Sequence, residues 1–248
     1  MSPSTDSREN REFATEIKFL ISPALAEQIR GWARAQLSPD PNASGAAGDG
    51  YQITSLYFDT QQFDVFHRRG SYGRSKYRIR RYGQGEVAFL ERKLKSRGLL
   101  AKRRSIVRLG ELERLSSDKV ERGGDGYWFQ RRLRARGLSP VCQISYRRTA
   151  RVAMTQYGPI RLTLDENVRA LPAPGFWFSD REDTLILKDQ IILELKFRYD
   201  LPALFKHLIG TFALMPNAFS KYRQSTVALG LQSESDSVTK ENRIPEYA

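Results

Sequence analysis

Charged residues spaced two positions apart recur at four places in the chain, and they are the residues best suited to chemistry. They are Glu16 with Lys18, Arg78 with Arg80, Glu91 with Lys93, and Glu194 with Lys196. In a β-strand this spacing places both side chains of a pair on the same face. Guanidinium and ammonium groups gathered on one face bind phosphate oxygens, and a guanidinium fork meets two of them at once. The spacing therefore points to the binding of a phosphate-rich anion.

The residues between these charges are apolar, for example Ile17 and Phe19, or Leu193 and Leu195. Antiparallel sheets commonly have one dry and one wet face, so a solvated outer face would account for this alternation. A face dominated by Arg and Lys over several strands is unfavourable, however, unless an anion compensates it. The cations also lie on predicted strands scattered over most of the chain. If those strands close on themselves with the charges inward, they line a tunnel that holds a chain of phosphates.

The positive charge of the chain is concentrated between Arg68 and Arg108. This segment has fifteen Lys or Arg residues and only Glu86 and Glu91 as acids, so its surplus of thirteen equals the net charge of the whole protein, +13. A concentrated positive surface indicates a polyanion partner. No groove-reading or base-stacking motif accompanies it, and a basic nucleic-acid arm would not need to alternate. We therefore expect no specific nucleic-acid partner.

Composition sets the class of protein. With 248 residues, 40% of them hydrophobic, the chain can bury one substantial core. Cys142 is the only cysteine, which excludes an internal disulfide framework and a cysteine-rich zinc site. The first ten residues lack an apolar stretch, and no run reaches the roughly 18 apolar residues of a membrane span. These features predict a soluble, cytoplasmic protein.

The chain is predicted to form a single domain over residues 12–231, between a flexible head at 1–11 and a flexible tail at 232–248. Three consecutive strands are expected at 75–82, 86–96 and 102–109, joined as an antiparallel meander. The other predicted elements are strands at 12–21, 51–59, 141–155, 159–165 and within 185–199, and helices from Pro23, within 112–137, at 202–215 and from Lys221.

Eight short motifs follow one another along this domain. They are E-I-K-F (16–19), S-L-Y-F-D-T (55–60), K-Y-R-I-R-R-Y-G (76–83), F-L-E-R-K (89–93), Y-R-R-T-A (146–150), I-R-L-T-L-D (160–165), L-E-L-K (193–196) and F-S-K-Y (219–222). Their order resembles the vacuolar transporter chaperone (VTC) domain, which belongs to the triphosphate tunnel metalloenzymes. The resemblance spans residues 11–225. It implies an α+β fold, with an antiparallel closed β-barrel and flanking helices around a basic tunnel.

The resemblance also implies which residues act on phosphate. Those implied to be catalytic are Arg78, Arg80, Lys93, Lys196 and Glu194, with Glu194 as the carboxylate that binds Mn²⁺ or Mg²⁺. The implied phosphate ligands are Lys18, Arg78, Arg80, Lys93, Arg148, Arg161, Lys196 and Lys221, joined by Lys102 or Arg104, whose register is ambiguous. Ser220 precedes Lys221 at a predicted helix start, where it would bind phosphate or serve only as the N-cap.

One departure from the superfamily narrows the activity. The hydrolytic and cyclase relatives begin with Glu-x-Glu-x-Lys, whereas Ala14 precedes Glu16 and Lys18 here. A carboxylate for metal binding is therefore missing, which weakens an interpretation as a thiamine triphosphatase or an adenylate cyclase. The membrane helices of eukaryotic VTC subunits are also absent, so export of a product would need a membrane-protein partner in trans.

Several polar residues allow more than one interpretation. Glu194 could form an internal ion pair with a neighbouring lysine instead of binding metal, and Asp165 could support the metal or cap a strand end. Glu16 and Glu91 are expected to orient cations, and Asp59 is expected in a turn. No catalytic triad or metal motif includes either histidine, and His207, within the predicted helix at 202–215, is expected to be structural or solvent-facing. Core packing is favoured over base stacking for the aromatic residues Tyr51, Tyr57, Phe58, Tyr77 and Tyr82.

The leading hypothesis is a polyphosphate polymerase that transfers the γ-phosphate of ATP onto a growing polyphosphate chain inside the tunnel. A terminal phosphate is already anionic at neutral pH, so no strong general base is required. The alternatives are a tunnel triphosphatase that hydrolyses ATP or tripolyphosphate, and a non-catalytic module that binds polyphosphate. ATP and polyphosphate are the expected partners, and the sequence leaves the oligomeric state open.

Overall fold

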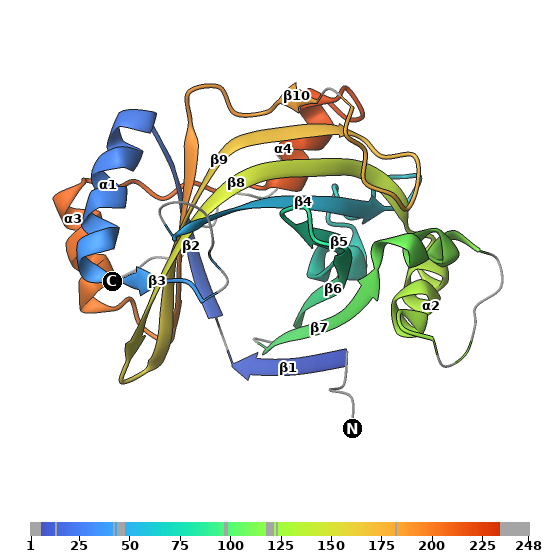
Figure 1. The fold of residues 1–248 in the computed structure, drawn as a ribbon, viewed down its shortest axis with the longest axis horizontal. Coiled ribbons are helices and arrows are strands. Elements are labelled where there is room, and N and C mark those ends of the chain that lie inside the picture. The colour runs from blue at the N-terminus through green and yellow to red at the C-terminus, as the bar shows by residue number, and fades with distance from the viewer. Residues whose placement is uncertain are drawn as a thin grey trace.

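A computed structural model describes residues 6–12, 14–41, 43, 48–96, 99–117, 122, 124–181 and 183–233. Eleven strands form one antiparallel sheet in the order β1-β7-β6-β5-β4-β8-β9-β11-β2, with β10 added to β9 and β3 to β8 (Figure 1). The strands are β1 (Asp6–Glu12), β2 (Ala14–Ile21), β3 (Ser38–Pro39), β4 (Gly50–Asp59), β5 (Ser75–Tyr82), β6 (Val87–Ser96), β7 (Leu99–Arg108), β8 (Ser139–Thr155), β9 (Gly158–Pro172), β10 (Thr184–Leu185) and β11 (Ile191–Arg198).

The sheet curls into a loose barrel that hydrogen bonds do not close. Its two end strands, β1 and β2, follow each other in the chain, yet in the described residues β1 pairs with β7 and β2 with β11, and not with each other. The prediction of an antiparallel barrel with flanking helices is confirmed, and the prediction of full closure is corrected. The chain passes directly from one end of the sheet path to the other, so the seam falls between two consecutive strands.

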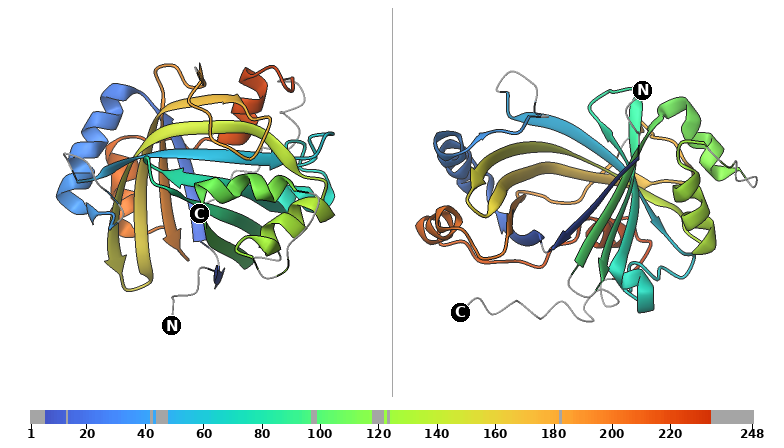
Figure 2. Two further views of the ribbon diagram at one scale, coloured as in Figure 1. Left: turned by 45° about the vertical axis from the view of Figure 1, so that its right-hand side comes forward. Right: turned by 90° about the horizontal axis from the view of Figure 1, so that it is seen from below.

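The helices at 23–36, 127–135 and 203–211 cover the outside of the curled sheet, whereas the helix at 221–228 packs on its inner face, where Lys221 contacts Asp165 and the ring of Tyr222 stacks on Tyr57. These helices are α1 (Pro23–Gln36), α2 (Tyr127–Ala135), α3 (Ala203–Thr211) and α4 (Lys221–Ala228), with short 3₁₀ helices η1 (Gly70–Arg74) and η2 (Leu109–Ser116). Helices α1 and α3 lie together at one side of the molecule and α2 at the opposite side (Figure 2). The start of α1 agrees with the prediction, because Ser22 caps it, with its hydroxyl 3.3 Å from the amide nitrogen of Leu25, and Pro23 is the first helical residue.

Two apolar clusters occupy the space between the sheet and these helices. Below α1 and α3, one cluster joins Ile17 and Phe19 of β2 to Leu193 and Leu195 of β11. The other includes Leu56, Ile79 and Leu90 of neighbouring strands, with Phe129 and Leu133 of α2. In the strands that alternate apolar and charged residues, the apolar side chains thus point outward. The charged side chains of the same strands therefore lie on the inner face. A solvated outer face is therefore not the explanation of the alternation.

Several element boundaries differ from the predicted ones. The meander at 75–82, 86–96 and 102–109 is confirmed as β5, β6 and β7, but the last strand starts three residues earlier. Within the head predicted at 1–11, residues 6–11 belong to β1, whose pairing with β7 has no local signal in the sequence. Residues 1–5 and 234–248 lie outside the described part. Within that part, no helix combines the length and apolar character needed to cross a membrane.

Candidate active site

The register of β5, β6 and β7 brings the predicted phosphate ligands side by side. It forms three cross-strand rows: Lys76–Lys93–Lys102, Arg78–Glu91–Arg104 and Arg80–Phe89–Ile106. Lys102 and Arg104 both face inward, which resolves their ambiguous register, because residues two apart share a face. Arg103 points the other way, and its guanidinium lies 4.4 Å from the ring centroid of Trp128. These rows form the first wall of the site.

A second wall comes from strands at the other end of the sheet path. Its rows are Glu16–Lys196–Arg161 and Lys18–Glu194–Thr163, formed by β2, β11 and β9, and Asp165–Arg148, formed by β9 and β8. All seven charged residues in these rows lie on the inner face. We call the space between the two walls the lumen.

The two walls approach each other at Glu16. Lys93 Nζ on β6 lies 3.5 Å from Glu16 Oε2 on β2, although β6 and β2 are far apart in the strand order. Glu16 forms two more ion pairs: its Oε1 lies 2.9 Å from Lys18 Nζ, and its Oε2 lies 3.7 Å from Lys196 Nζ. Burial would raise the pKa of Glu16, but these three lysines outweigh it and lower the pKa well below the usual value. Glu16 thus serves to gather lumen lysines, as expected from the sequence.

Glu91 gathers arginines on the first wall, as Glu16 gathers lysines. Arg78 Nε lies 2.6 Å from one of its oxygens and Arg104 Nε 3.3 Å from the other. Burial opposes ionisation of Glu91, but Arg78, Arg80 and Arg104 together lower its pKa to about 2. Arg80 is buried and donates to Ser55 Oγ and to the hydroxyl of Tyr146, at 3.2 and 3.0 Å. The arginines are therefore fixed in place before any anion binds.

Glu194 is the predicted metal ligand, and the structure shows it in the ion pair with Lys196 that was the alternative interpretation; its role as a metal ligand stays a prediction. Its Oε1 is buried, and its 2.5 Å contact with Lys196 Nζ is an ion pair without hydrogen-bond geometry. Burial would raise the pKa of Glu194, but Lys196 lowers it, so the group is a carboxylate. The described residues contain no cluster of three or more His, Cys, Asp or Glu that could hold a metal by itself. A Mn²⁺ or Mg²⁺ ion would therefore need phosphate oxygens to complete its shell, as such ions commonly do.

Asp165 holds two of the predicted phosphate ligands. Arg148 binds it with both guanidinium branches, at 2.6 and 2.7 Å, and Lys221 Nζ from α4 lies 2.5 Å away. Burial is outweighed by these cations, which lower the pKa of Asp165. The structure thus brings Arg148 and Lys221 together, already paired with a carboxylate. The pairing fits neither the strand-end cap nor the metal support considered for Asp165, and is an internal ion-pair centre instead.

Arg161 is likewise paired. It lies 2.9 Å from Asp40, a buried residue after β3, and donates to the hydroxyl of Tyr51 at 2.7 Å. Sequence reasoning missed Asp40, because it sits in a Pro- and Gly-rich stretch that gives no sign of its distant partner. No signal in the spacing could have found this pair.

Lys76 is a further lumen cation that was not among the predicted ligands. It extends the Arg78 and Arg80 alternation by one step, so the period-2 pattern could have found it. Its side chain is open to solvent, but the surrounding lumen walls limit its hydration. Burial lowers the pKa, and Lys18, Arg68 and Lys93 lower it further, to about 8.

Asp59 organises the turn after β4, as predicted, and also anchors α4. Its carboxylate accepts hydrogen bonds from the backbone amides of Thr60, Val65 and Phe66, at 2.7, 2.8 and 2.9 Å. The hydroxyl of Tyr222 on α4 donates to Asp59 Oδ2 at 2.6 Å. Ser220, just before this helix, has its hydroxyl 3.5 Å from the amide of Arg223, which is the N-cap geometry. Its phosphate-binding role stays a prediction.

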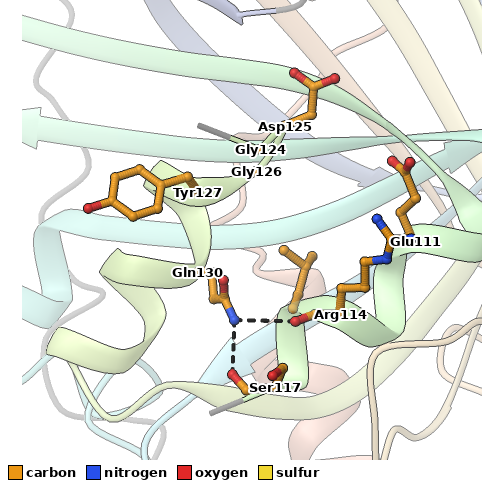
Figure 3. Close-up of a pocket in the computed structure, with 9 residues that line it drawn as sticks. Glu111, Arg114, Ser117, Gly124, Asp125, Gly126, Tyr127 and Gln130 are labelled. Atoms are coloured by element: carbon orange, nitrogen blue, oxygen red, sulfur yellow. Dashed lines mark hydrogen bonds between the residues drawn. The ribbon is translucent and has the colours of Figure 1, made fainter. Parts of the chain in front are cut away.

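Neither histidine joins these clusters. His207 is exposed on α3, with its ring 3.5 Å from the hydroxyl of Thr211, and His67 contacts Gln232 at 3.1 Å. A cavity of about 440 Å³ lies away from the lumen, between η2 and the start of α2 (Figure 3). The side-chain amide of Gln130 donates hydrogen bonds to the backbone carbonyls of Arg114 and Ser117, which also line the cavity. Glu111, Asp125 and Arg114 also line it, so its lining carries both signs of charge, unlike the cation-rich lumen.

Solved structures share this fold. A candidate adenylate cyclase from Bacillus halodurans superposes with a TM-score of 0.52 at 16% identity, covering 84% of this chain and 94% of that one. A candidate adenylyl cyclase from Hippeastrum, described as having a dominant triphosphatase activity, superposes with a TM-score of 0.50 at 16% identity, covering 89% of this chain and 97% of that one. These likenesses show that the chain shares the fold of these two proteins.

Sequence comparison then gives the family. The VTC domain profile matches residues 13–229, and the chain belongs to this family. No curated protein matches the sequence. The resemblance inferred from the eight motifs is thereby confirmed, and the family implies triphosphate substrates.

Proposed function

We propose that the protein is a polyphosphate polymerase that uses ATP. The terminal oxygen of a polyphosphate chain attacks the γ-phosphorus of ATP, the bond from that phosphorus to the β–γ bridging oxygen breaks, and ADP leaves. The acceptor becomes one phosphate longer. Phosphoryl transfer of this kind depends on alignment and on neutralisation of spreading negative charge, which cations provide.

The observation that carries this proposal is the excess of cations in a lumen formed by two walls. The lumen cations are Lys18, Lys76, Arg78, Arg80, Lys93, Lys102, Arg104, Arg148, Arg161, Lys196 and Lys221. The carboxylates that meet them are Glu16, Glu91, Asp165, Glu194 and Asp40. Such an excess is unfavourable until an anion with many charges enters, and a chain of phosphates supplies such charges.

The roles of the individual residues follow from their places. Arg78, Arg80 and Lys93 would hold the phosphates from the first wall, and Lys196 would do so from the second. Glu194 would hold Mn²⁺ or Mg²⁺, which supplies a Lewis acid for the phosphate oxygens when bound. We assign no general base, because the attacking phosphate is already an anion.

Tunnel triphosphatase activity is the second candidate, because the Hippeastrum protein with the same fold is described as mainly a triphosphatase. That reaction would need an activated water. A binding module without turnover is the third, and Ala14 supports it, because this position lacks the additional carboxylate of the hydrolytic relatives.

Variants separate these functions from one another. With ATP, Mn²⁺ and a short polyphosphate primer, Arg78→Glu should lower chain elongation roughly 100-fold or more, and so should Glu194→Gln. Arg131→Glu, an identical charge change at an exposed position on α2, should leave the rate within about twofold. Elongation that survives both lumen variants would overturn the site assignment. Release of orthophosphate without elongation would favour the triphosphatase.

A further inference from the structure

One end of the lumen is lined by aromatic rings. Tyr51, Tyr82 and Phe89 lie at neighbouring ends of β4, β5 and β6, on the face that carries the phosphate ligands. The ring centroids of Tyr51 and Tyr82 are 5.7 Å apart, and those of Tyr82 and Phe89 are 5.4 Å apart. All three side chains are partly exposed. We call these three residues the aromatic collar.

Apolar surface continues outward from the aromatic collar. Ile106 is directly opposite Phe89 in the β6–β7 register, and Val87 lies two residues before Phe89 on the same face. Both are unusually exposed for large apolar side chains, at 38% and 39%. Exposed apolar groups next to a basic lumen serve a ligand that has both an apolar part and anionic charge.

Two arginines join the aromatic collar to the phosphate ligands. The guanidinium of Arg104 lies 3.6 Å from the ring centroid of Phe89 and donates to the hydroxyl of Tyr82 at 3.2 Å. Arg161 donates to the hydroxyl of Tyr51. The Arg104 side chain is 29% exposed, so its plane and the ring of Tyr82 offer flat surfaces at the same place. Nucleobases stack on such aromatic rings and guanidinium planes.

The opposite end of the first wall has a different character. There the row Lys76–Lys93–Lys102 contains only lysines, and the row between the two ends contains Arg78, Glu91 and Arg104. The lumen therefore changes from aromatic to purely cationic along its length. A ligand with a flat ring at one end and a phosphate tail at the other fits this gradient in one orientation.

We propose that the aromatic collar binds the nucleobase of a nucleoside triphosphate and so distinguishes ATP from inorganic tripolyphosphate. This inference rests on the proposed function, because it assumes that a triphosphate occupies the lumen. The base stacks against Tyr82 and Arg104, the α- and β-phosphates follow toward Arg80 and Arg78, and the γ-phosphate points toward the lysine row. The acceptor chain then approaches from the lysine end.

Calorimetric titration of the full chain with ATP and with tripolyphosphate tests this arrangement. Tyr82→Leu and Phe89→Leu should each weaken ATP binding about 10-fold while tripolyphosphate binding stays within about twofold. Tyr82→Phe keeps the ring and loses only the hydroxyl, so it should bind ATP nearly as well as the wild type. Tyr157→Leu, at an exposed position in the β8–β9 hairpin, is the matched control and should change neither affinity.

The outcomes separate the two proposals. Unchanged tripolyphosphate binding shows that a variant is folded, so a selective loss of ATP binding supports the collar. An equal loss of both ligands in both Leu variants, or no loss of either, overturns the collar and leaves the proposed function standing. A wild-type protein that binds neither ligand overturns the proposed function and the collar together.

Discussion

Lys93 on β6 and Glu16 on β2 form an ion pair of 3.5 Å across the seam of the sheet. Hydrogen bonds in the described residues do not join the end strands β1 and β2, so charge and not backbone pairing draws the two walls together here. Glu16 also contacts Lys18 and Lys196, so one carboxylate attracts three lysines from both walls. The lumen is thus held together by the same type of interaction that would bind its substrate.

Glu16→Gln should destabilise the protein by about 1–3 kcal/mol, because it leaves three lysines near one another without their shared carboxylate. Urea unfolding at neutral pH measures this change. Added tripolyphosphate should raise the melting temperature of the variant more than that of the wild type, since it replaces the lost negative charge. An unchanged free energy of unfolding would show that Glu16 does not hold the seam.

Lys76 should make anion binding weaken as the pH rises. Its pKa is lowered to about 8 by burial and by neighbouring cations, so above this pH it loses its charge and its attraction for phosphate. The affinity for tripolyphosphate should fall between about pH 7 and about pH 9 more steeply in the wild type than in Lys76→Met. Parallel pH profiles for the two proteins would contradict a titrating Lys76, and the comparison removes the titration of the ligand itself.

Acid should destabilise the protein through Glu91. Its folded-state pKa of about 2 is below its unfolded value, so its contribution to stability is present above about pH 4.5 and disappears as the pH falls toward 2. The full contribution is roughly 3 kcal/mol at most. Glu91→Gln should therefore be less stable at pH 7 and show a flatter loss of stability on acidification. A variant with the acid unfolding profile of the wild type would refute this role.

Tyr222→Phe should loosen α4. Without the phenolic hydroxyl, the buried Asp59 loses its 2.6 Å hydrogen bond, and about 1–3 kcal/mol of stability should be lost. Hydrogen exchange should increase in α4 more than in β8, because the tether joins α4 to the end of β4. The removal of a hydroxyl from the surface residue Tyr157, as Tyr157→Phe, serves as the control. Equal exchange of α4 in both variants would argue against the tether.

Much of the site could be predicted because residues two positions apart in a β-strand lie on the same face. Arg78, Arg80 and Lys93 required only that their strands exist, and the strands were evident from β-branched and aromatic residues. The inward-facing cations among Lys102, Arg103 and Arg104 could not be identified from the sequence alone, since this depends on which residue of β7 lies opposite Glu91.

What could not be predicted depends on contacts between distant segments. Asp40 pairs with Arg161, although more than a hundred residues separate them in the sequence. Tyr222 and Asp59, which form a hydrogen bond, are even farther apart in the sequence. The open seam was missed for the same reason, because the pairing of β1 with β7 is invisible to local patterns. Local sequence determines on which face of a strand each side chain lies. Which cation pairs with each carboxylate depends on how the sheet curls.

Product analysis of a single reaction tests the central claim most directly. The wild-type protein is incubated with ATP, Mn²⁺ and a short polyphosphate primer, and the products are followed by ³¹P NMR and sized by gel electrophoresis. We predict growth of the signal from internal phosphates of longer chains, with one ADP formed for each phosphate added. ATP consumption that yields only ADP and orthophosphate, or no consumption at all, would contradict a polymerase.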